Sequence, residues 1–206
     1  MRYIGDVHGK YSQYRELIRN IPASIQVGDM GVGFIAAVRD DVRYLSNPPH
    51  YAMRQGNHRF IRGNHDNPGV CQRHSQWIAD GTVEGDTMFI GGALSVDRAS
   101  RTEGYSWWAD EELSTVALNN LVDKYIETKP RVMITHDCPE EVAEEMERMF
   151  CRDKINDPSR TRQALQSMWS AHSPELWLFG HWHNSFRQVL RGTTFICLAE
   201  LEVLDI

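Results

Sequence analysis

Short hydrophobic runs alternate with longer amphipathic stretches along this chain, which predicts alternating strands and helices. The short runs predict strands at residues 2–4, 24–27, 59–61, 87–90, 131–134 and 176–179, and a closing hairpin of residues 186–190 and 194–198. The amphipathic stretches predict helices at residues 11–20, 34–45, 111–127, 140–150 and 161–170. This order is typical of a layered α/β fold, and the pattern shows no linker or repeat, so we expect a single domain over residues 1–206.

Side chains that bind metals follow five of the predicted strands. They are Asp6 and His8, Asp29, Asn64, His136, and His181 with His183. In open α/β sheets, ligands bind beyond the carboxyl ends of the strands, so we expect these side chains to converge on one site. Neighbouring glycines allow the tight turns that such crowding requires.

Carboxylate, imidazole and amide ligands in this number suit a pair of divalent ions that hydrolyse a phosphate ester. Asp29 is our choice for the carboxylate that bridges the two ions, because a shared anion screens their repulsion. Asp6 and His8 are one residue apart and can reach one ion from the same turn, and His181 and His183 have the same spacing. Mixed oxygen and nitrogen ligands favour Mn²⁺, Fe²⁺, Zn²⁺ or Ni²⁺ over Ca²⁺, and we predict two divalent ions with Mn²⁺ as the first choice.

His65 follows Asn64 directly and is predicted to point in a different direction. A histidine titrates near neutral pH, so His65 is the candidate general acid that protonates the leaving alkoxide. Asp66 could orient the His65 ring through a hydrogen bond, although an aspartate after a turn often caps a helix instead. Asp137 is either a partner of His136 or a solvated loop acid.

The five segments resemble the metallophosphoesterase (calcineurin-like phosphoesterase) superfamily, whose pattern is D-x-H, G-D, G-N-H-[DE], H and G-H-x-H. The resemblance extends from Asp6 to His183. It implies a four-layer α/β/β/α sandwich of two mixed β-sheets flanked by helices. It also implies a first metal held by Asp6, His8, Asp29 and His183, a second held by Asp29, Asn64, His136 and His181, and a metal-bridging hydroxide as the nucleophile. In the same family pattern His65 is the acid and Asp66 its partner.

Two segments, Gly5-Asp6-Val7-His8-Gly9 and Arg62-Gly63-Asn64-His65, resemble the serine/threonine phosphoprotein phosphatase branch. That branch has a phosphate-binding arginine after its second motif, whereas residues 30–34 here are Met-Gly-Val-Gly-Phe. The stretch at residues 91–108 resembles small bacterial and phage members of the superfamily. Arg98 or Arg101 could replace the missing arginine, and Trp107 and Trp108 could form a lid or stack on a base.

Composition changes this picture little. A formal net charge of −6 argues against an extended nucleic-acid surface. The four cysteines, Cys71, Cys138, Cys151 and Cys197, lie far apart and suggest reduced thiols in the cytoplasm. No membrane-spanning run and no signal-peptide pattern is visible, so we expect no membrane partner. The histidines outside the motifs, namely His50, His58, His74 and His172, are expected to be structural or on the surface.

Three functions are consistent with the ligand set. The first is a phosphatase acting on a phosphomonoester, either a phosphorylated small molecule such as a nucleotide or a phosphoprotein. The second is a phosphodiesterase or nuclease acting on a cyclic nucleotide or nucleic acid. The third is a non-enzymatic scaffold, which the complete ligand set makes the weakest of the three. The motifs leave the oligomeric state open.

Overall fold

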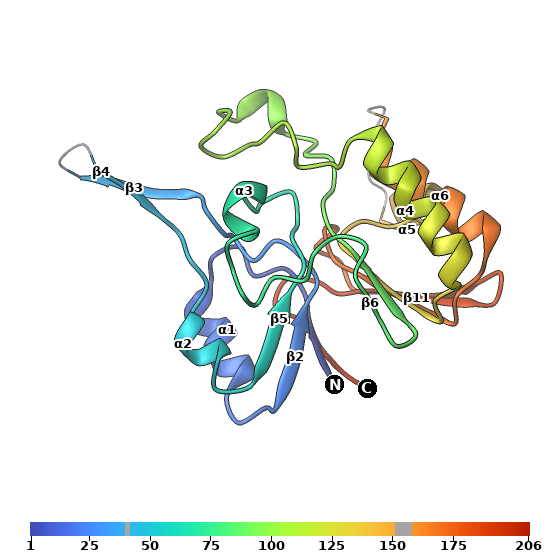
Figure 1. Ribbon diagram of the computed structural model, residues 1–206, viewed down its shortest axis with the longest axis horizontal. Helices are drawn as coiled ribbons and strands as arrows, with labels where there is room; N and C mark the ends of the chain where they lie inside the picture. Colours follow the sequence, from blue (N-terminus) through green and yellow to red (C-terminus); the bar gives the residue numbers. More distant parts are fainter. Residues whose placement is uncertain (40–41, 151–157) are drawn as a thin grey trace.

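Two β-sheets pack face to face at the centre of the computed structural model, which describes residues 1–39, 42–150 and 158–206. Figure 1 shows α1 and α2 beside the sheet that contains β2 and β5, and α4, α5 and α6 beside the sheet that contains β6 and β11. The layers therefore follow the order helix, sheet, sheet, helix. This confirms the four-layer α/β sandwich expected from the family resemblance.

The first sheet has four strands in the order β12-β1-β2-β5. They are β12 (Val203–Asp205), β1 (Arg2–Ile4), β2 (Ala23–Gln26) and β5 (Asn57–Phe60). The strands β1, β2 and β5 are parallel, and β12 pairs antiparallel with β1. Three parallel carboxyl ends therefore lie at the same edge of this sheet.

The second sheet has six strands in the order β10-β11-β9-β8-β7-β6. They are β10 (Phe186–Leu190), β11 (Thr193–Cys197), β9 (Leu176–Phe179), β8 (Val132–Thr135), β7 (Thr87–Ile90) and β6 (Val83–Glu84). The four inner strands are parallel, whereas the edge strands β10 and β6 are antiparallel to their neighbours. Both sheets are therefore mixed.

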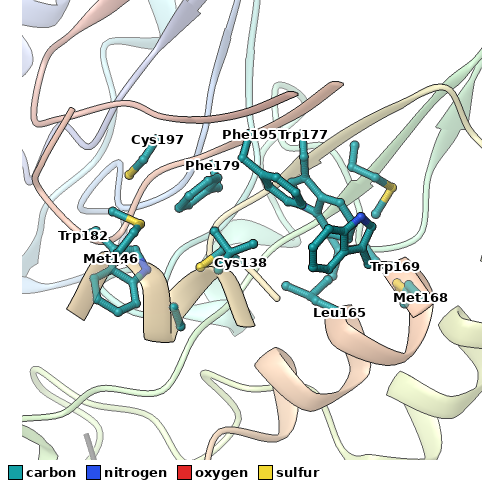
Figure 2. Close-up of a cluster of buried hydrophobic side chains, with 14 of the residues drawn as sticks. Cys138, Met146, Leu165, Met168, Trp169, Trp177, Phe179, Trp182, Phe195 and Cys197 are labelled. Carbon is teal, nitrogen blue, oxygen red and sulfur yellow. The ribbon is translucent and has the colours of Figure 1, made fainter. Parts of the chain in front are cut away.

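Hydrophobic residues fill each of the three interfaces between layers. Ile25, Phe89, Ile134 and Leu178 belong to the cluster between the two sheets. A second cluster lies between the six-stranded sheet and helices α5 and α6, where Figure 2 shows Trp177, Phe179 and Phe195 packed against Leu165, Trp169 and Met146. A third cluster lies under α1 and α2. Because every layer is packed on its neighbour, the strand ends that carry the site have a rigid support.

In the described part of the chain, six α-helices flank the sheets or lie in the loops between strands. They are α1 (Tyr11–Ile18), α2 (His50–Met53), α3 (Pro68–Cys71), α4 (Thr115–Thr128), α5 (Glu140–Met149) and α6 (Arg160–Ala171), with a 3-10 turn at Arg98–Ser100. The Ser114 hydroxyl accepts a hydrogen bond from the Ala117 N–H, so α4 begins later than the pattern predicts. No helix among the described residues is long and apolar enough to cross a membrane.

Residues 34–45 do not form the predicted helix. Their described part is a hairpin of β3 (Ile35–Arg39) and β4 (Val42–Leu45), and Figure 1 shows it projecting away from the two main sheets. The segment is rich in β-branched and aromatic residues, which favour strands. Hydrogen bonds between Gly33 and Ser46 and between Ser46 and Phe34 continue the pairing toward the body of the protein.

Candidate metal centre

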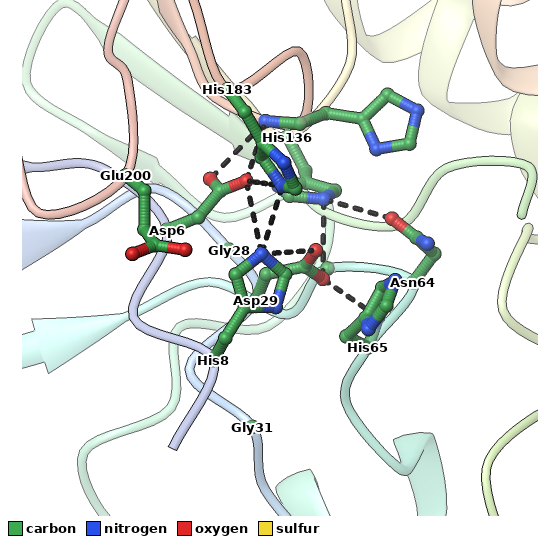
Figure 3. A network of polar contacts seen from close by, with 12 residues as sticks. Asp6, His8, Gly28, Asp29, Gly31, Asn64, His65, His136, His183 and Glu200 are labelled. Carbon is green, nitrogen blue, oxygen red and sulfur yellow. Dashed lines mark hydrogen bonds and ion pairs between the residues drawn. The ribbon is translucent and has the colours of Figure 1, made fainter. Parts of the chain in front are cut away.

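The predicted ligands converge where the carboxyl ends of the two sheets meet. Asp6 and His8 follow β1, Asp29 follows β2 and Asn64 follows β5. From the other sheet, His136 follows β8, and His181 and His183 follow β9. Each sheet therefore supplies part of the ligand set. Figure 3 shows the labelled ligands pointing toward one another, namely Asp6, His8, Asp29, Asn64, His136 and His183.

Two glycines let the backbone come close to the ligands. A Cβ added at Gly28, where φ is +99°, would overlap the Nδ1 atom of His136. A Cβ added at Gly63 would overlap the carboxylate of Asp29. Asp29 itself has a φ of 58°, a left-handed conformation that non-glycine residues rarely adopt. The strain is consistent with a backbone shaped to place its side chains at a functional site.

The first group of possible ligands consists of Asp6, His8, Asp29 and His183. One ligand atom from each lies within 4.8 Å of the others. The His183 Nε2 atom is 3.1 Å from the Asp6 Oδ2 atom, and the His8 Nε2 atom is 3.8 Å from the Asp29 Oδ2 atom. This group is the set that the family resemblance implies for the first metal.

The second group consists of Asp29, His136 and His181, whose ligand atoms also lie within 4.8 Å of one another. The His136 Nε2 atom is 3.3 Å from the Asp29 Oδ1 atom and 3.1 Å from the Asn64 Oδ1 atom. Asp29 belongs to both groups, as expected for a bridging carboxylate. His181 and His183 fall into different groups, as the family resemblance implies, so their spacing of two positions does not place them in the same group.

The electrostatics of the site fit a bound cation. Asp6 and Asp29 are almost completely buried, and the Asp29 Oδ2 atom accepts no hydrogen bond from the described residues. Burial alone would lower the pKa of His136, but the Asp29 carboxylate outweighs it and raises this pKa to about 10. A divalent ion held by the buried Asp6 and Asp29 carboxylates would balance their negative charge.

Neighbouring groups hold two of the ligands in position. The His136 Nδ1 atom is 2.9 Å from the Val27 carbonyl oxygen, so Nδ1–H donates to it and Nε2 faces the site. The Asn64 Nδ2 atom donates to the Ser95 hydroxyl (3.0 Å), which in turn donates to the Glu111 carboxylate (2.5 Å). This chain turns the Asn64 carbonyl oxygen toward His136.

His65 lies beside the ligands and contacts Arg101. The Arg101 Nη2 atom is 2.7 Å from the His65 Nε2 atom, and the Arg101 guanidinium also forms two bonds of 2.7 Å to the Asp97 carboxylate. Burial lowers the pKa of His65; Asp29 raises it and Arg101 lowers it further, and the net shift is downward. His65 is thus placed near the ligands as predicted, with the Arg101 guanidinium at its Nε2 atom.

Asp66 has a different role from the one predicted. Its carboxylate accepts hydrogen bonds from the backbone N–H groups of Gly63 (2.7 Å), Gly31 (2.7 Å), Val32 (2.8 Å) and Met30 (3.2 Å). These bonds tie the loop after β2 to the loop after β5. Asp66 therefore supports the loops that carry the ligands, and the position beside the His65 ring belongs to Arg101.

The four predicted substrate-binding residues separate in the structure. A cavity of about 270 Å³ over the ligands is lined by Asp97 and Arg101, but Arg98 and Trp107 line another cavity. Trp108 is 8% exposed and packs edge-on against Phe34, with 5.0 Å between ring centroids. Trp108 is therefore a buried residue that contacts Phe34, and neither tryptophan lines the cavity over the ligands.

The sequence analysis did not identify one positively charged side chain at the site. Arg162, in the first turn of α6, lines the same cavity although it is 4% exposed. Its Nε atom donates to the Asp137 carboxylate (2.8 Å), and its guanidinium lies 4.9 Å from the centroid of the Trp182 ring. Asp137 is thus a buried partner of Arg162, with its carboxylate 4.0 Å from His181. Only the fold shows this, since an arginine at a helix start normally suggests a surface residue.

The histidines outside the motifs lie away from the centre. His58 is buried within β5 and its Nδ1 atom is 2.8 Å from the Ser24 hydroxyl. His50 and His74 stack on each other, with ring centroids 4.4 Å apart.

Cys71, Cys138 and Cys197 are buried free thiols, and Cys151 lies outside the described residues.

Comparisons with known proteins agree with the geometry. The family model for calcineurin-like phosphoesterases matches residues 3–185, which include every proposed ligand. A solved structure of GAP50, the anchor in the inner membrane complex of Plasmodium, is similar over 97% of this chain and 71% of that chain, at 11% identity and a TM-score of 0.46. No curated protein matches the chain. The chain therefore belongs to the calcineurin-like phosphoesterase family, whose members are metal-dependent hydrolases of phosphate esters.

Proposed function

We propose that this protein is a phosphatase that hydrolyses a phosphomonoester at a centre of two divalent ions, with Mn²⁺ as the first choice of metal. The observation that carries the proposal is the sharing of Asp29 between two complete groups of ligands, with His65 beside them. Its substrate would be a phosphorylated small molecule or protein. The buried free thiols support a reducing compartment such as the cytoplasm.

The proposed ligands form two sets, one for each ion, that share one residue. Asp6, His8 and His183 would hold one, while Asn64, His136 and His181 would hold the other, with Asp29 shared. Divalent ions bound there supply positive charge for the phosphate and lower the pKa of a water molecule. The hydrogen bonds that His136 donates to the Val27 carbonyl oxygen and that Asn64 donates to the Ser95 hydroxyl keep these ligands oriented before substrate arrives.

Two arginines favour a monoester, whose phosphate carries up to two negative charges. Arg101 and Arg162 both line the cavity over the ligands, and each is held by a carboxylate, Asp97 and Asp137 respectively. A guanidinium can bind two phosphate oxygens at once. We infer that the phosphate draws Arg101 away from the His65 Nε2 atom, which frees that nitrogen to carry the proton for the leaving oxygen.

The test compares Mn²⁺-dependent turnover of p-nitrophenyl phosphate and bis-p-nitrophenyl phosphate by one preparation. We expect a strong preference for the monoester. Arg101→Gln should reduce kcat/KM for the monoester by about 10- to 100-fold, as expected for loss of a charged hydrogen bond. Arg98→Gln is the matched control, because Arg98 lies three residues away and lines another cavity. A preference for the diester would identify a phosphodiesterase, and no turnover of either ester would support the scaffold.

A further inference from the structure

A second cavity adjoins the one over the ligands, and His65 lines both. Its volume is about 320 Å³, and it is lined by His8, Gly9, Gly31, Phe34, Ser46 and His65. Among the described residues, those that line it carry no carboxylate and no guanidinium, whereas Arg101 and Arg162 both line the first cavity. The site thus has a charged compartment and a largely uncharged one that meet at His65.

The second compartment has an aromatic wall. The rings of Phe34 and His65 are nearly parallel, at an angle of 18° with centroids 5.9 Å apart. The edge contact between Phe34 and the buried Trp108 ring, at 80°, supports Phe34 from behind. A flat ring of a bound ligand can therefore stack against Phe34 and His65, whose side chains are already held in position.

The floor of this compartment is fixed as well. The Gly31 carbonyl oxygen accepts hydrogen bonds from the Tyr11 hydroxyl (2.8 Å) and the Ser46 hydroxyl, and the Gly31 N–H donates to Asp66. Gly31 has a φ of +88°, and a Cβ there would overlap the backbone of Gly9. The compartment is thus built from groups that hold one another in place, as binding sites usually are.

We propose that this compartment binds the leaving group of the substrate, and that the leaving group is a flat aromatic ring, as in an aryl or nucleoside phosphomonoester. The inference rests on the proposed function. With the phosphate among the ligands, the leaving oxygen must come within reach of His65, which also lines the second compartment. About 320 Å³ is at the small end for a ligand pocket and suits one small molecule.

The test measures binding rather than turnover. Phenylphosphonate and methylphosphonate carry the same phosphoryl group on an aromatic and an aliphatic substituent, and neither is hydrolysed. Calorimetry on the Mn²⁺-loaded protein, at a pH where both are fully ionised, gives the ratio of their Kd values. We expect phenylphosphonate to bind about 5- to 100-fold more tightly, the range typical for stacking of a base on an aromatic residue.

Substitutions at Phe34 test whether the aromatic wall causes the preference for phenylphosphonate. Phe34→Leu should remove most of the preference, and Phe34→Tyr should keep it, because a tyrosine preserves the ring. Tyr51→Leu is the matched control, since Tyr51 is 81% exposed and lies on α2; it should leave the ratio unchanged.

An equal affinity for both phosphonates, or a preference that survives Phe34→Leu, would overturn this inference. Turnover of p-nitrophenyl phosphate in the same preparation would still support the proposed phosphatase. If neither phosphonate bound and neither p-nitrophenyl ester was hydrolysed, both the inference and the proposed function would fail.

Discussion

Replacing Asp66 by asparagine should destabilise the protein by about 3–6 kcal/mol, the range expected when two buried hydrogen bonds to a charged acceptor are lost. Each carboxylate oxygen of Asp66 accepts two backbone hydrogen bonds: Oδ1 from Gly31 and Val32, and Oδ2 from Gly63 and Met30. Asparagine keeps one acceptor oxygen and turns an NH₂ group toward the other two N–H donors. Two bonds to a charged acceptor are lost at about 1.5–3 kcal/mol each, and two N–H groups remain buried without a partner.

Urea unfolding followed by tryptophan fluorescence measures this loss. The experiment is done with a chelator present, so that metal binding does not contribute to the stability. The midpoint should fall by about 1 M or more for a slope of about 3 kcal/mol per M. Asp97→Asn is the matched control, because the Asp97 side chain is 50% exposed and its substitution should cost less than about 1 kcal/mol.

The same measurement separates two interpretations of Asp66. If its carboxylate mainly oriented the His65 ring, Asp66→Asn would change the pH profile of turnover and leave the stability nearly unaltered. A loss of less than about 1 kcal/mol would therefore refute the structural role, because it is smaller than the cost expected for even one charged hydrogen bond.

Four further predictions follow from the structure around the centre. Arg162→Gln should cost about 3–5 kcal/mol because it leaves Asp137 buried without its cation, and urea unfolding at neutral pH checks this. Burial raises the pKa of Asp137, but the Arg162 charge outweighs burial and lowers this pKa to about 2. The Asp137 carboxylate therefore stabilises the protein fully above the usual aspartate pKa of 3.8, and this contribution is lost as the pH falls toward 2, so acid unfolding of metal-free wild type and Asp137→Asn should differ in that window. Gly28→Ala should reduce Mn²⁺ affinity at least tenfold, since the added methyl overlaps a ligand imidazole, whereas Gly69→Ala, with only one neighbour at 3.6 Å, should not; calorimetry distinguishes them. His65→Asn should lower kcat by about 10²- to 10⁴-fold without changing the metal content, and an unchanged kcat would remove its role as acid.

The metal ligands could be predicted because their chemistry and order survive in the sequence. Asp29, Asn64 and His136 each follow a short hydrophobic run, and a run of that kind predicts a strand that ends at a common edge. The parallel strands bring Asp29 and Asn64 to one edge of the first sheet, whereas their approach to His136, from the second sheet, depends on how the two sheets pack. The strand pattern also predicted the hairpin around Arg191 and Gly192, which the structure confirms.

Other features could not be predicted because they depend on contacts distant in sequence. The role of Asp66 depends on N–H groups more than 30 residues away, and the burial of Arg162 depends on Asp137. The hairpin at residues 34–45 was missed because its apolar residues also fit a helical period, although their β-branched character favours strands. Phe34, at the start of that hairpin, was missed with it.

The central claim is that two divalent ions share Asp29. Calorimetric titration of metal-free protein with Mn²⁺ measures the number of ions bound per chain most directly. The account predicts two ions for the wild type and weakened binding of both for Asp29→Ala, since Asp29 belongs to both groups of ligands. One ion per chain in a fully active wild type, or two tightly bound ions in Asp29→Ala, would contradict it.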